Sequence, residues 1–133
     1  MLTSEEIAIR VYQMLNSSQV SAMITGSVAY ERSDYAKEDV IVIPHTVTGE
    51  GSVRYGQINV NIHVPDVPVG TGFAINFKRL VDIKKSVIDV LENHYEAVSG
   101  YNWNIGSLDP PIKDPKYDEH FVCVKLELTI RNQ

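Results

Sequence analysis

The sequence lacks the features that mark secreted and membrane-spanning proteins. It contains one cysteine, Cys123, so no intrachain disulfide can form, as is usual in a reducing compartment. Its apolar runs are short, as in Val40-Ile41-Val42-Ile43, whereas a membrane-spanning helix needs about 20 apolar residues. The first residues, Met-Leu-Thr-Ser-Glu-Glu, have neither the basic start nor the apolar stretch of a signal peptide. We therefore expect a cytoplasmic protein without a membrane partner.

Positive charge is also scarce. The chain has 12 Lys and Arg against 17 Asp and Glu, a formal net charge of −5 and a pI of about 5.3. Nucleic-acid-binding proteins usually gather Lys and Arg on one face, because neutralising phosphates supplies most of their affinity. The densest basic cluster, Lys78, Arg79, Lys84 and Lys85, is interrupted by Asp82, which is typical of a solvated helix face. The charge balance predicts no specific nucleic-acid binding.

Length and composition indicate one globular domain. A chain of 133 residues has the size of a single domain, here 1–133, and buries about two-thirds of its unfolded surface. Hydrophobic residues make up 44% and charged residues 22%, which are ordinary values for globular proteins.

Two helices are predicted. In the first, Thr3 is a good N-cap and Glu6 completes a capping box, while Asn16-Ser17-Ser18 ends the helix. Its apolar stripe consists of Ile7, Val11, Met14 and Leu15. The second helix runs from about Ala74 to His94. Its stripe consists of Phe77, Leu80, Val81, Lys84, Val87, Ile88 and Leu91, widened by Ile83 and Val90.

The clearest strand signal lies between Gln57 and Val64. Apolar and polar residues alternate there with a period of two, which is typical of a half-buried strand. The polar side is formed by Gln57, Asn59, Asn61 and His63. Two interpretations of this nearly uncharged side stand: a solvated face, or a contact with another subunit, because interface cores are depleted in charge.

Further strands are predicted around Ala29-Tyr30, from Asp39 to Pro44 and from Phe121 to Ile130. The stretch 45–56 is expected to form a long hairpin loop and 65–72 a loop with two prolines and two glycines. The stretch 96–120 is expected to be irregular, with Trp103 either in a short strand or packed across the core edge. Strands gather in the middle and at the end rather than alternating with helices. This order predicts an α+β fold: an antiparallel sheet of about four to five strands, two helices packed on one face, and an extended hairpin.

A search for metal-binding or phosphate-binding residues finds no pattern that identifies a site. The histidines, His45, His63, His94 and His120, are scattered and show no metal-ligand spacing. The pairs Gly49-Glu50-Gly51 and Gly70-Thr71-Gly72 lack the rest of a phosphate-binding loop. We predict no catalytic, cofactor-binding or metal-binding residues, and hence no enzyme and no cofactor.

The acidic clusters and the single thiol are also interpreted without a catalytic role. The carboxylates Asp109, Asp114, Asp118 and Glu119 lie in a proline-rich stretch with Lys113 and Lys116, so a solvated mixed-charge loop is expected rather than a carboxylate pair for hydrolysis. The same interpretation applies to Asp34, Glu38 and Asp39. Cys123 is interpreted as a structural or partly buried thiol, since the sequence shows no base or positive group to activate it.

The order of elements resembles the small tail-completion, or tail-terminator, proteins of long-tailed phages. The resemblance rests on the N-terminal helix 3–15, the strands and hairpin of 39–64 ending in Ile62-His63-Val64-Pro65-Asp66, the helix 77–91 followed by Asn93-His94-Tyr95, and the closing strand 121–130. These stretches cover most of the chain, and the proline-rich 108–116 departs from the layout. The resemblance implies a ring, commonly a hexamer, that ends tail-tube polymerisation at the head-proximal end and joins other tail or neck proteins in the virion.

Three hypotheses follow. The first is a structural tail-assembly protein of a phage or prophage that acts by self-association into a ring. The second is a small intracellular binding module for a protein or small ligand, which predicts a concave apolar pocket. The third is an enzyme with a site assembled in space, which predicts clustered ionisable groups with shifted pKa values in a cleft.

Overall fold

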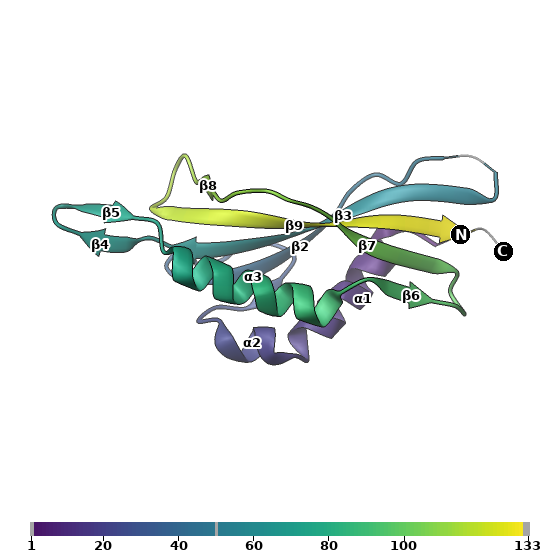
Figure 1. The fold of residues 1–133 in the computed structure, drawn as a ribbon, viewed down its shortest axis with the longest axis horizontal. Helices are drawn as coiled ribbons and strands as arrows, with labels where there is room; N and C mark the ends of the chain where they lie inside the picture. The colour runs from purple at the N-terminus through teal and green to yellow at the C-terminus, as the bar shows by residue number, and fades with distance from the viewer. Residues whose placement is uncertain (1, 50, 132–133) are drawn as a thin grey trace.

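Two long strands, β3 and β9, form the axis of the molecule (Figure 1). The computed structural model describes residues 2–49 and 51–131. The helices are α1 (Ser4–Asn16), α2 (Gln19–Met23) and α3 (Phe77–Leu91). The strands are β1 (Val28–Ala29), β2 (Asp39–Pro44), β3 (Val53–Pro65), β4 (Val67–Val69), β5 (Gly72–Ala74), β6 (His94–Glu96), β7 (Tyr101–Leu108), β8 (Ile112–Lys113) and β9 (Glu119–Arg131).

The fold is α+β, as predicted, but the sheet is larger than expected and is mixed. It is strongly curled, with strand order β1-β2-β3-β9-β7-β6, and β8 also pairs with β9. The predicted antiparallel sheet is wrong at one edge, because β1 runs parallel to β2. There the Gly26 N–H donates to the Glu38 carbonyl, in a contact too close for any Cβ at position 26. A short strand was predicted around Ala29-Tyr30 and β1 lies there, but strands of two or three residues carry no measurable period, so the sequence did not reveal β6 and β8.

The core lies between one face of the sheet and the helices. β3 and β9 pair over their full length, from Val53 opposite Arg131 to Pro65 opposite Glu119. All three helices, rather than the predicted two, lie on this side (Figure 1). The sheet contributes to the core Val40, Val42, Ile58, Val60, Ile62, Val64, Val122, Val124, Leu126, Leu128 and Ile130.

The capping box of α1 is confirmed, since the Thr3 side chain accepts from the Glu6 N–H and the Glu6 carboxylate accepts from the Thr3 N–H. The apolar stripe of α3 is narrower than predicted. Leu80, Ile83, Val87 and Leu91 are buried. Phe77 and Val81 are exposed, because at 3.6 residues per turn they lie to one side of the stripe formed by these four residues.

One segment interpreted as a loop and one interpreted as irregular contain strands. The 65–72 segment begins a hairpin, β4–β5, with Gly70 in the left-handed conformation at its turn. The 96–120 segment contains β7, which pairs with β9 and buries Trp103. The indole N–H donates to the carbonyls of Leu91 and Glu92 at the end of α3. In both segments, prolines and glycines hid strands that end or turn next to them.

The predicted hairpin at 45–56 is present as the connection between β2 and β3, with Thr48 bridged to Tyr55. Among the described helices, none combines the length and the apolar character needed to span a bilayer.

Candidate functional site

The histidines have different surroundings. His94 Nε2 is 2.8 Å from Glu96 Oε1, and its ring stacks on Trp103. His120 Nδ1 is 2.6 Å from an Asp66 carboxylate oxygen. Within residues 2–49 and 51–131, no three His, Cys, Asp or Glu side chains are arranged to hold a metal ion.

The acidic residues of the 109–119 stretch have different surroundings. Asp109 is 2.9 Å from the Lys125 ammonium. Asp114 accepts the backbone N–H groups of Lys116 and Tyr117, and these bonds, led by that of Lys116, lower its pKa. Asp118 is exposed. For these three residues, the geometry agrees with the expected solvated mixed-charge loop.

Glu119 departs from that interpretation, because its side chain is completely buried. Arg32 Nη1 lies 2.7 Å from both carboxylate oxygens of Glu119, and Arg32 Nε is 2.9 Å from Asp39 Oδ2. His63 Nδ1 is 3.0 Å from Glu119 Oε1. These four residues, Arg32, Asp39, His63 and Glu119, form what we call the buried charge cluster.

Four separate segments bring the buried charge cluster together. Arg32 comes from the loop between β1 and β2, and the other three residues come from the adjacent ends of β2, β3 and β9. Tyr35 covers the Arg32 guanidinium at 4.5 Å, and Tyr117 stacks on Tyr35 at 3.8 Å. Burial, followed by the positive charge of Arg32, lowers the pKa of His63 despite its bond to Glu119. With its carboxylate enclosed, the cluster is suited to fastening the 30–38 loop to the sheet.

A second buried acid fastens a helix. Arg79 donates to both carboxylate oxygens of Glu38 at 2.7 Å and to the Met23 carbonyl. The bond to Glu38 raises the pKa of Arg79. The predicted solvated faces are therefore wrong for Arg79, Glu38 and Asp39. The sequence could not reveal these pairs, because each joins residues that are far apart along the chain.

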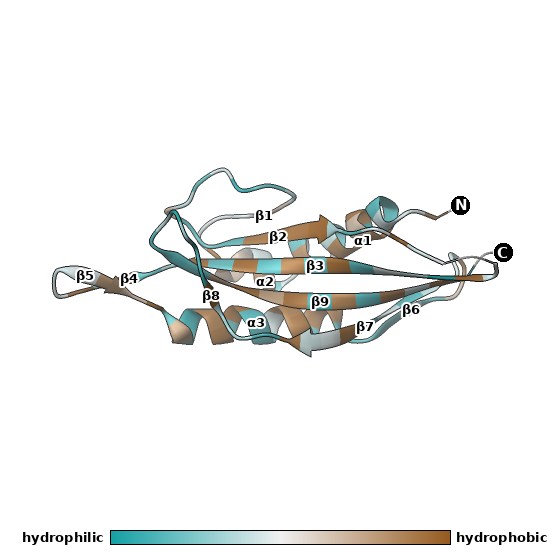
Figure 2. Cartoon of the chain, turned by 90° about the horizontal axis from the view of Figure 1, so that it is seen from above, coloured by the Kyte–Doolittle hydropathy of each residue, from teal (hydrophilic) through white to brown (hydrophobic). Residues whose placement is uncertain are grey.

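The most unusual surface is the hairpin β4–β5, which extends beyond the end of the sheet in both views (Figures 1 and 2). The stretch 67–77, Val-Pro-Val-Gly-Thr-Gly-Phe-Ala-Ile-Asn-Phe, contains no charged residue. Val69, Phe73 and Phe77 are 58%, 57% and 59% exposed. We call residues 67–77 the arm. Exposed apolar groups concentrated on a projection are typical of a protein contact.

The arm has a rigid base. Directly after β3, the Asp66 N–H donates to the Asp118 carbonyl at 2.9 Å. The Asp66 side chain is only 2% exposed and is held by His120 and by Lys113, whose ammonium is 3.3 Å away. The arm therefore continues the direction of β3 away from its own sheet.

A second surface lies on the side of the sheet opposite the helices. The central residues there come from β2, β3 and β9, and no described helix lies in front of them (Figure 2). We call the partly exposed members of this set the open sheet face: Ile43, Asn59, Asn61, Phe121 and Cys123. Its members are uncharged. Ile41, opposite Asn61, points to the same side but is buried. Burial raises the pKa of the Cys123 thiol, and the Lys125 charge only partly offsets this.

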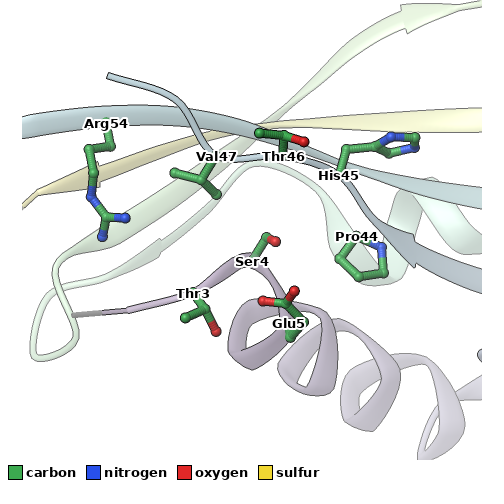
Figure 3. Close-up of a pocket in the computed structure, with 8 residues that line it drawn as sticks. All are labelled: Thr3, Ser4, Glu5, Pro44, His45, Thr46, Val47 and Arg54. Carbon is green, nitrogen blue, oxygen red and sulfur yellow. The ribbon is translucent and has the colours of Figure 1, made fainter. Parts of the chain in front are cut away.

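A groove of about 380 Å³ lies between α1 and the segment after β2 (Figure 3). Its lining consists of Thr3, Ser4, Glu5, Pro44, His45, Thr46, Val47 and Arg54. Most of these side chains are polar, whereas small-molecule sites are predominantly apolar with a few polar groups. Arg54 is already engaged with the Leu2 carbonyl at 2.8 Å. The groove is therefore a weaker candidate than the arm.

Comparison with known proteins gives no family assignment: no family model matches the chain, and no curated protein matches it. The candidate site is accordingly the pair of uncharged surfaces, the arm and the open sheet face. Sequence patterns had identified the polar side of β3 as a possible contact. They missed the arm, although eleven consecutive residues without charge at 67–77 were a readable signal.

Proposed function

We propose that this chain is a tail-completion, or tail-terminator, protein of a long-tailed phage or prophage, a structural subunit that self-associates into a ring at the head-proximal end of the tail. The observation that carries the proposal is the arm, an uncharged apolar projection held rigidly at its base. The layout resemblance supplies the biological setting and the other tail or neck proteins as further partners.

The physical argument concerns the free energy of exposed apolar side chains. Fully burying one Val or Phe side chain contributes about 1.5–3 kcal/mol. The arm presents three such groups that are more than half exposed, Val69, Phe73 and Phe77. Contact with another protein is the simplest way to bury them, and interface cores are depleted in charge just as the arm is.

The position of the arm favours a ring over a symmetric dimer. The arm lies at one end of the long axis, whereas the bulk of the sheet lies to one side of it (Figure 1). A contact between an arm and a different surface of a neighbour is heterologous. Such contacts close into a ring when the rotation per subunit divides a full turn, and otherwise grow into filaments. A ring subunit needs complementary surfaces rather than a catalytic site.

The test is the mass in solution, measured by light scattering on a sizing column over a range of concentrations, followed by imaging. We expect a discrete ring-sized species with a central channel. The double variant Val69→Asp/Phe73→Asp should be monomeric, because each carboxylate would have to be desolvated in the contact. Val98→Asp is the matched control: Val98 is 92% exposed and lies outside the arm, so the ring should persist.

A wild-type chain that is monomeric at every concentration contradicts the proposal. So does a ring that survives both arm substitutions. In either case the binding-module hypothesis takes precedence, with the groove beside α1 as its site.

A further inference from the structure

We infer that the open sheet face is the surface on which the arm of a second copy of this chain docks. This inference rests on the proposed function and adds to it the identity of both halves of the contact. It assigns a role to a sheet face that the helices of the same chain leave uncovered (Figure 2).

The first argument is the chemistry of the open sheet face. Asn61 and Cys123 form one uncharged row, next to the buried Ile41. In the next row, Asn59 lies between Ile43 and Lys125. The Lys125 ammonium is paired with Asp109 at 2.9 Å. On the opposite side of the first row, the charged side chains are those of the buried charge cluster. The five members of the open sheet face therefore include no charge that a docking partner would have to desolvate.

The second argument is that the occupant must come from another molecule. The Asp66 contacts with Asp118, His120 and Lys113 hold the base of the arm in line with β3. In both views the arm extends beyond the end of its own sheet (Figures 1 and 2). It cannot fold back over its own face without breaking these contacts, whereas the arm of a neighbour displaced along the long axis can reach it.

The third argument is the match between the two surfaces. Val69 and Phe73 are apolar and suit Ile43 and Phe121, while the small tip Gly70-Thr71-Gly72 lets backbone approach closely. The amide groups of Asn59 and Asn61 can donate to and accept from that backbone. Since both surfaces are uncharged, contact buries apolar area without desolvating a charge.

The native Cys123 supplies a direct test, because it is the only thiol and lies on the open sheet face. In Thr71→Cys each chain carries one thiol on the arm and one on the face. A short bismaleimide should then link successive copies into dimers, trimers and higher species on a denaturing gel. Thr71→Cys/Cys123→Ser has a single thiol and can give dimers at most. Gln13→Cys, which places the second thiol on the exposed side of α1, should not give the ladder.

A second variant tests the same contact without cross-linking. Asn61→Lys adds a charge in the middle of the open sheet face and should abolish the ring, with Gln13→Lys as the control that keeps it. A ring-sized wild type that gives no ladder and keeps its ring in Asn61→Lys overturns this inference while the proposed function stands. A ladder together with loss of the ring in Asn61→Lys supports both. A wild type that never exceeds a monomer overturns both.

Discussion

The side chains on the two faces of β3 differ in burial and in chemistry. Ile58, Val60, Ile62 and Val64 are at most 1% exposed, beneath the helices. Their neighbours Gln57, Asn59, Asn61 and His63 point to the other side and are each partly buried. The period of two fixes which residues share a face, but it does not say what covers that face.

The comparison shows that low charge and deep burial are separate properties. The helix side is apolar because it must exclude water within the chain, whereas the open sheet face combines apolar, amide and thiol groups. The buried charge cluster lies on the same side of the sheet, at the end of β3, where Arg32 and two carboxylates are removed from water and paired with each other. The two faces should therefore respond differently to substitution, which four experiments can measure.

The largest effect is expected in the buried charge cluster. Arg32→Ala leaves Glu119 buried with no arginine and should lower the free energy of unfolding by about 3–5 kcal/mol. Urea unfolding followed by circular dichroism measures the change. The double variant Arg32→Met/Glu119→Gln removes the charges of this pair while Asp39 keeps its own, and it should recover part of the loss. If the double variant is no more stable than Arg32→Ala, the cost does not come from the unpaired Glu119 charge.

The next experiment compares the two faces directly. Leu126→Ala, on the helix side, creates a cavity and should cost about 2–5 kcal/mol. Asn61→Ala, on the open sheet face of the adjacent strand, should change stability by about 0.5 kcal/mol or less in the monomer. The measurement is urea unfolding at a concentration too low for self-association. Comparable losses in the two variants would mean that the open sheet face is part of the folding core.

Much of this architecture was readable from local patterns. The capping box at Thr3, the alternation in β3 and β9 and the apolar positions of α1 were all predicted, because each depends on residues close together in the sequence. What failed depends on contacts at long range. The parallel β1, the buried Glu119 and the Arg79–Glu38 pair each join segments that sequence spacing does not relate.

The candidate site was less accessible to sequence reasoning than the fold. The polar side of β3 had two open interpretations, since alternation cannot tell solvent from a partner. The arm was mistaken for a loop because Pro68, Gly70 and Gly72 signal turns. Its three-residue strands were too short to leave a period. Only the structure shows that it projects and exposes Phe73.

A smaller effect concerns pH. Burial and the Arg32 charge lower the pKa of His63 below its ordinary value of 6.5, so the folded state disfavours the charged ring. The unfolded chain then binds the proton more readily, and stability should fall as the pH drops below about 6.5, down to the folded pKa. His63→Gln should lessen this loss between pH 7 and 5, as measured by urea unfolding at each pH. Identical slopes in the two proteins would assign the pH dependence to other groups.

The smallest effect is the reactivity of the single thiol, and it tests the open sheet face most locally. Burial raises the pKa of Cys123 from 9.0, the Lys125 charge lowers it and the Asp109 charge raises it. Because the thiolate is the reacting form, alkylation at pH 7.5 should be slower in the folded chain than in urea. Lys125→Met should slow the folded rate further, whereas Asp109→Asn should increase it. Equal rates in both variants would show that access, rather than the local charges, controls the thiol. In the ring the wild-type rate should fall again, because the arm of the neighbour would then cover Cys123.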